Sequence, residues 1–170
     1  MTEILILRVI HILSATLWVG SAIFGSVMLM PVLGRIGPAA GPVMVGLRER
    51  GLTRFMPTVA ILTILSGLRL LWILSGGFAA AYFATARGAT YAASGAAAIA
   101  AFVLGIVVAR PLMLRMGALA AEIGSAGEAR RAAISRELAA ARRTNVIVQW
   151  VVGVLLVGSV ARMAVARYIG

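Results

Sequence analysis

Four long apolar segments alternate with arginine-rich segments along this chain of 170 residues. A helix needs about 20 mostly apolar residues to cross the hydrocarbon core of a bilayer. Each apolar segment has that length, and the four cover approximately residues 4–33, 55–76, 88–110 and 144–167. The pattern therefore predicts an all-α integral membrane four-helix bundle, built as a single transmembrane domain over residues 1–170. The first run follows Glu3 instead of a basic cluster and is too long for a secretory signal, so we treat it as retained.

Helix-breaking and helix-favouring residues indicate the boundaries of these spans. The first span runs into MLMPVLGRIGPAAGP, where we expect the helix to be broken by Pro31, Gly34, Gly37, Pro38, Gly41 and Pro42. Between spans three and four, Ser125 and Glu128 have the spacing of a capping box. Alanine, arginine and glutamate, which are good helix formers, follow them. We therefore expect a cytoplasmic helical extension over residues 111–143 that runs into span four. No internal repeat is evident.

The arginines predict the orientation. The loops at 34–54 and 110–143 hold eleven of the 16 arginines, whereas the loop between spans two and three holds only Arg87. Cytoplasmic loops of membrane proteins carry the excess of positive charge. Both of these loops are therefore expected in the cytoplasm and both termini outside, in a multi-pass protein of the bacterial inner membrane.

Composition narrows the class and the partners. The chain is 62% hydrophobic, with a mean hydropathy of +1.03, so the lipid bilayer is its expected surroundings. Its net charge of +11 comes from arginines that lie mostly between apolar segments, which argues against nucleic acid as a partner. Small residues crowd spans three and four, in YAASGAAAIAAFVLG and VVGVLLVGSVA. Such faces let membrane helices approach closely, within the bundle, in self-association or against other membrane subunits.

The only histidine lies inside the first span. His11 shares one helical stripe with Arg8 and Trp18, at spacings of three and seven residues. A neutral imidazole there can ligate haem iron or copper, or can only hydrogen-bond to a neighbouring helix. Arg8 and Arg69 are expected at the same outer side. They suit an anionic group such as the propionates of a porphyrin, unless they extend to the lipid headgroups.

Other chemistry is poorly represented. Thioethers favour Cu(I), but Met28 and Met30 are two residues apart and point to different helix faces, which favours a packing role. The sequence shows no serine–histidine–acid set, no phosphate-binding glycine loop and no paired carboxylates inside a span. We therefore assign no catalytic residues.

Two stretches resemble a group of small bacterial membrane proteins. In RVIHILSATLWVG, His11 is followed seven residues later by Trp18, as in the first helix of HemJ-type protoporphyrinogen oxidases and of the CopD copper-resistance family. RERGLTRFMPTVAILTILSGLRLL, residues 48–71, resembles the second span of HemJ-type proteins. The resemblance implies a four-helix fold and haem b bound through His11. HemJ-type proteins also carry a lysine in the third helix. This chain has none, so the resemblance implies the haem site more than the oxidase activity.

Three functional hypotheses follow. The first is a haem b-binding membrane protein with its cofactor site at His11, Arg8, Arg69 and Trp18 and with His11 as the metal ligand. This site is expected on the outer side, between spans one and two. The second is a non-enzymatic accessory subunit packed against a larger electron-transfer or photosynthetic membrane complex. The third is a copper-handling membrane protein.

Overall fold

The spanning segments form four long helices. The computed structural model describes residues 2–169, apart from the side chain of Pro38, and contains no strand within them. Four helices are long and apolar enough to cross a membrane: Thr2–Ile36, Leu52–Leu74, Ala86–Glu122 and Glu128–Ala166. The all-helical architecture predicted from the apolar segments is confirmed, and it is compatible with a membrane bundle.

The first long helix ends within the predicted stretch, at Ile36, but it passes through Pro31 without breaking. It is continuous from α1 (Thr2–Phe24) through a π-helical turn (Gly25–Leu29) into α2 (Met30–Ile36). At this turn the Met30 N–H bonds the Gly25 carbonyl, five residues back. A proline ring normally clashes with the carbonyl four residues before it, and a π-turn is a known way to adjust the helix locally. The helix ends at Gly37, whose φ of 59° suits glycine.

The third long helix repeats this arrangement. It consists of α6 (Ala86–Leu104), a π-helical turn (Gly105–Ala109) and α7 (Arg110–Glu122), with Pro111 just after the turn. The glycine that opens each π-turn precedes its proline by the same number of residues, in GSVMLMP and GIVVARP. The structure therefore reveals a repeated helical unit that the hydropathy pattern does not show.

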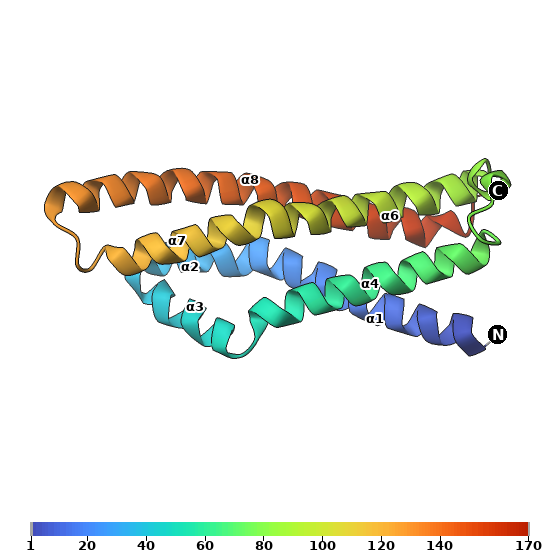
Figure 1. Ribbon diagram of the computed structural model, residues 1–170, viewed down its shortest axis with the longest axis horizontal. Helices are drawn as coiled ribbons and strands as arrows, with labels where there is room; N and C mark the ends of the chain where they lie inside the picture. The colour runs from blue at the N-terminus through green and yellow to red at the C-terminus, as the bar shows by residue number, and fades with distance from the viewer. Residues whose placement is uncertain (1, 170) are drawn as a thin grey trace.

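Two helical hairpins make the bundle. After a short 3₁₀ turn (Gly37–Ala39) and α3 (Ala40–Glu49), α4 (Leu52–Leu74) packs along α1, and α8 (Glu128–Ala166) packs along α6. α1 also contacts α8, and α4 contacts α6, which closes the bundle. The start of α1, the end of α8 and the short α5 (Ala80–Phe83) lie at one end, and α3 with the α7–α8 turn lies at the other (Figure 1).

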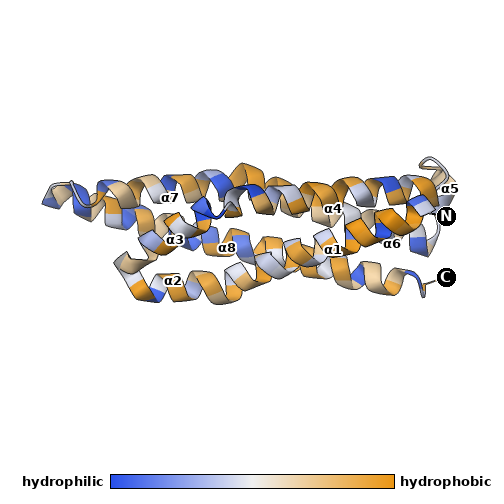
Figure 2. Cartoon of the chain, turned by 90° about the horizontal axis from the view of Figure 1, so that it is seen from below, coloured by the Kyte–Doolittle hydropathy of each residue, from blue (hydrophilic) through white to orange (hydrophobic). Residues whose placement is uncertain are grey.

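The apolar side chains lie both inside and outside this bundle. A small core joins all four helices, and its buried members are Trp18, Val59, Ala60, Ala98, Ala101, Val152 and Leu156. Many larger apolar side chains face outward instead, such as Val107 at 64% and Val154 at 66% exposure. Figure 2 shows that hydrophobic residues recur along the length of the long helices. An exposed apolar surface of this extent is unfavourable in water and suits lipid.

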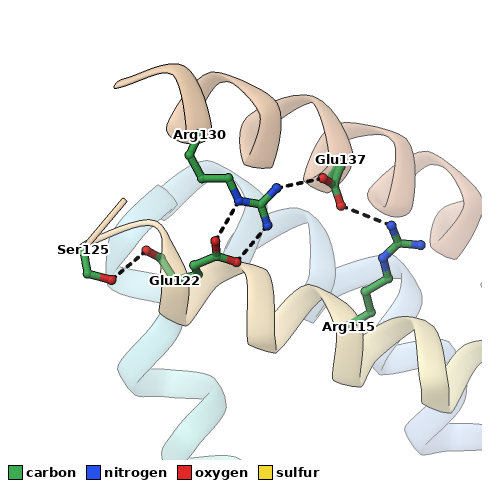
Figure 3. A network of polar contacts seen from close by, with 5 residues as sticks. All are labelled: Arg115, Glu122, Ser125, Arg130 and Glu137. Carbon is green, nitrogen blue, oxygen red and sulfur yellow. Dashed lines mark hydrogen bonds and ion pairs between the residues drawn. The ribbon is translucent and has the colours of Figure 1, made fainter. Parts of the chain in front are cut away.

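Ion pairs join α7 to the first turns of α8 (Figure 3). Arg130 of α8 contacts Glu122 of α7 at 2.7 Å and Glu137 of its own helix at 3.3 Å. Arg115 of α7 reaches the same Glu137, at 3.1 Å. Since α8 has 39 residues, it is about 58 Å long at 1.5 Å per residue, nearly twice the hydrocarbon thickness of about 30 Å. Residues 111–143 are helical, as predicted, apart from the turn that joins α7 to α8.

The predicted capping box at the start of α8 is not formed. The N-cap residue is Gly127, and it makes no side-chain cap. The Ser125 hydroxyl instead donates to the Glu122 carbonyl, at 3.2 Å, and so closes the end of α7 (Figure 3). Ser125 lies two residues before the N-cap, Gly127, so its hydroxyl does not cap the N–H groups of the first turn of α8.

The small residues of spans three and four pack within the bundle. Ser94, Ala98 and Ala101 of α6 are buried, and the Ser159 hydroxyl of α8 donates to the Ser94 carbonyl at 2.8 Å. The close approach between these two helices, which the small faces predict, is therefore satisfied by the chain itself.

Candidate functional site

A partly open pocket lies among the four long helices, in the half of the bundle that holds the start of α1 and the end of α8. Its volume is about 350 Å³, toward the lower end of the roughly 300–1,000 Å³ usual for small-molecule sites. Most of its walls are apolar. The lining residues whose side chains carry hydrogen-bonding or charged groups are Arg8, His11, Trp18, Thr63, Tyr91, Ser159 and Arg167.

His11 is held on α4 through one ring nitrogen. Its Nδ1 lies 2.8 Å from the Thr63 carbonyl oxygen and 3.3 Å from the Ser66 hydroxyl oxygen. A carbonyl only accepts hydrogen bonds, so Nδ1 carries the proton and donates, and the lone pair is left on Nε2. Among residues 2–169, nothing hydrogen-bonds Nε2. Histidines that bind metals usually have this arrangement, with the other ring nitrogen donating to a carbonyl or carboxylate.

Gly67 fixes the position of the imidazole. The ring packs against α4 where this residue has no side chain, and a Cβ built there would lie 2.8 Å from His11 Cε1 and 3.1 Å from Nδ1. Any larger residue would displace the ring. The contacts of His11 with Gly67, Thr63 and Ser66 were not predicted from the sequence. Their spacing of three and four residues is the signal that could have found them, since it places small and polar groups on one face of span two.

Trp18 closes the pocket on the side of the core. It is 6% exposed, and its ring lies edge-on to Phe102 of α6, with the centroids 6.3 Å apart. It both lines the pocket and belongs to the core cluster. Arg8, His11 and Trp18, which were predicted to share one stripe of the first helix, therefore line the same pocket.

The arginines that line the pocket are not the two that the sequence predicted. Arg8 lines the pocket, but Arg69 does not. Arg69 instead forms an ion pair with Glu3, with a guanidinium nitrogen 2.8 Å from the carboxylate. The second arginine that lines the pocket is Arg167, the residue that follows the last residue of α8.

Tyr91 brings a second uncommitted polar group. It lines the pocket from α6, and its hydroxyl has no hydrogen-bond partner in the described part of the chain. Tyr91 lies near Tyr82, which belongs to α5 and is outside the spanning segments. Burial raises the pKa of the Tyr82 hydroxyl, and the neighbouring Tyr91 adds to that shift.

The structure offers little for a metal bound by protein groups alone. No group of three or more His, Cys, Asp or Glu side chains comes together within residues 2–169. Met28 and Met30, considered above for copper, do not line the pocket, whereas Met163 of α8 does. His11 is thus the one nitrogen ligand that the pocket provides among its lining residues.

Comparisons with family models, with curated proteins and with solved structures found no match to this chain.

Proposed function

We propose that this protein is a multi-pass membrane protein that binds haem b in the four-helix pocket, with Nε2 of His11 as an axial ligand. The observation that carries the proposal is the hydrogen bond from Nδ1 to the Thr63 carbonyl, at 2.8 Å. It fixes the tautomer and leaves Nε2 free for a metal at the pocket. No catalytic role is assigned to any residue.

The other lining residues fit a haem by their chemistry. The mostly apolar walls suit the macrocycle, and Arg8 and Arg167 suit its two carboxylates because guanidinium groups bind carboxylates in a planar, bidentate manner. Trp18 adds a large aromatic surface to these walls and also belongs to the core. When bound, the haem supplies a redox-active iron, whose potential the protein sets through its axial ligand and surroundings.

The proposed orientation places this pocket on the outer side. The ends of the long helices that adjoin the pocket carry few arginines, whereas α3 and the α7–α8 hairpin at the opposite end carry most of them (Figure 1). The excess of positive charge marks the cytoplasmic side of an inner-membrane protein. Both termini then face outward.

An absorption spectrum of the purified protein tests the proposal. The wild-type chain, titrated with ferric haem b in detergent, is expected to develop a Soret band that His11→Ala abolishes. Thr63→Val is the matched control because the acceptor for His11 is the backbone carbonyl, which this change keeps. A chain that stays colourless and co-purifies with a larger complex would support the accessory-subunit alternative. Bound copper without a Soret band would support the copper-handling alternative.

The two pocket arginines allow a second test. Arg8→Gln with Arg167→Gln is expected to weaken haem binding while the Soret band is retained, since the iron ligand is unchanged. Arg69→Gln is the matched control because Arg69 lies outside the pocket, paired with Glu3. Equal losses in both variants would show that the arginines act only through overall charge.

A further inference from the structure

The first helices of the two hairpins line the pocket with equivalent residues. Each position on α1 has a counterpart on α6 eighty residues later, counted from the π-turn glycines Gly25 and Gly105. The same interval relates Pro31 to Pro111. The pairs whose members both line the pocket are His11 and Tyr91, Ala15 and Gly95, Trp18 and Ala98, and Val19 and Ile99.

The second helices repeat in the same way, at an interval of ninety-three residues. Buried Val59 and Ser66 of α4 correspond to buried Val152 and Ser159 of α8. The pairs whose members both line the pocket are Thr63 and Leu156, Gly67 and Val160, Leu70 and Met163, and Leu74 and Arg167. Most of the lining is therefore built from the same positions of both hairpins.

The helix contacts follow the same relation. Exchanging α1 with α6 and α4 with α8 turns the α1–α4 contact into the α6–α8 contact, and the α1–α8 contact into the α6–α4 contact. This is the pattern of a two-fold axis along the bundle, with α1 and α6 at diagonal corners. The pocket lies on that axis, so equivalent residues of α1 and α6 approach it from opposite sides.

We propose that Tyr91 is the counterpart of His11 and that its hydroxyl faces the bound haem from the side opposite His11. The inference rests on the proposed haem function and adds the residue at the second axial position. Tyr91 lines the pocket from α6, and within residues 2–169 its hydroxyl makes no hydrogen bond to another group of the chain. Tyrosine is also a known axial ligand of haem iron. α1 and α6 thus bring one polar side chain each, His11 and Tyr91, to equivalent positions of a mostly apolar pocket.

Substitutions of Tyr91 test this placement. We compare wild type, Tyr91→Phe and Tyr91→His by absorption and electron paramagnetic resonance of the ferric haem b complex. Tyr91→Phe is expected to shift the visible bands and to bind added imidazole several-fold more tightly, because the second axial position is opened. Tyr91→His is expected to give a low-spin complex with two imidazole ligands. Tyr82→Phe is the matched control, since Tyr82 is close by but does not line the pocket.

The outcomes separate the two proposals. A wild-type chain that binds no haem refutes the proposed function before any Tyr91 variant is measured. If the wild type binds haem through His11, but Tyr91→Phe and Tyr91→His both keep its spectrum and imidazole affinity, only the role of Tyr91 is refuted. Tyr91→Phe removes a single hydroxyl, and circular dichroism in detergent verifies that each variant is folded.

Discussion

Alanine in place of Gly67 would put a methyl group where the His11 ring lies. The added Cβ would be 2.8 Å from His11 Cε1, so the ring would have to retreat by at least 0.6 Å to reach the 3.4 Å of ordinary contact. Its Nδ1 is 2.8 Å from the Thr63 carbonyl oxygen. A retreat of that size stretches the hydrogen bond beyond the usual limit of about 3.2 Å.

Two effects of different size follow from this displacement. Overpacking of a filled interface costs about 1–3 kcal/mol, and an interhelical hydrogen bond in a membrane protein is worth about 0.6 kcal/mol on average. Overpacking therefore dominates the loss in the free energy of unfolding. The larger functional effect is on the ligand, because losing the partner of a metal-binding histidine typically lowers metal affinity by about 10–100-fold. We expect Gly67→Ala to lower haem affinity by that factor.

The assay is a ferric haem titration in detergent, with Gly95→Ala as the matched control. Gly95 also lines the pocket, but a Cβ built there meets nothing within 4 Å. Both changes replace glycine in a helix and gain the same helix propensity, about 1 kcal/mol, so their difference isolates the contact with His11. Equal haem affinity in the two variants would refute the idea that α4 holds the imidazole in a binding position.

Three further predictions concern the fold. Cysteine introduced at Ser125 is expected to label from the cytoplasmic side and cysteine at Thr85 from outside, and the reverse result would invert the proposed topology. Gly88→Ala would place a Cβ against the Tyr82 carbonyl. It should lower the free energy of unfolding by about 1–3 kcal/mol, and an unchanged melting temperature would contradict this. His11→Leu should leave the bundle folded in detergent, since it removes a hydrogen bond worth only about 0.6 kcal/mol, and collapse of the variant would show that the histidine organises the core.

The four spans could be predicted from the sequence because lipid imposes a simple requirement. Every backbone polar group must be satisfied within its own segment, so a long apolar run dictates a helix whatever surrounds it. The passage of the first helix through Pro31 could not be predicted in this way. It depends on a π-turn at Gly25, and the residues of such a turn have the same composition as the helix around them.

The stripe on the first helix could be predicted, but its partners on other helices could not. The spacing of His11 and Trp18 follows from the geometry of one helix. The contact of His11 with Thr63 and Gly67 depends on how α1 and α4 are aligned and rotated, which the hydropathy of the outer faces does not determine. The same freedom explains Arg69, which was expected near the ligand at the depth of Arg8 but is turned toward Glu3 instead.

The glycines of the small-residue spans illustrate the same point. Gly95 and Gly158 were natural candidates for close helix contacts, yet a Cβ at either position meets nothing within 4 Å. The tight contacts are at Gly67, against the His11 ring, and at Gly88, against the turn after α5. A small residue allows close approach, but only the relative rotation of the helices decides which small residues are used.

The comparison of the two hairpins suggests how a bundle of simple composition acquires a specific site. Where equivalent positions hold the same residue, as in the pairs Ser14 and Ser94 or Pro31 and Pro111, the residues shape or join the helices. Among the pairs whose members both line the pocket, several differ in polarity or bulk, namely His11 and Tyr91, Trp18 and Ala98, and Leu74 and Arg167. The repeated positions supply a scaffold whose axis runs through the pocket. The differences make the two sides of that pocket chemically unlike, which is what a ligand bound in one orientation requires.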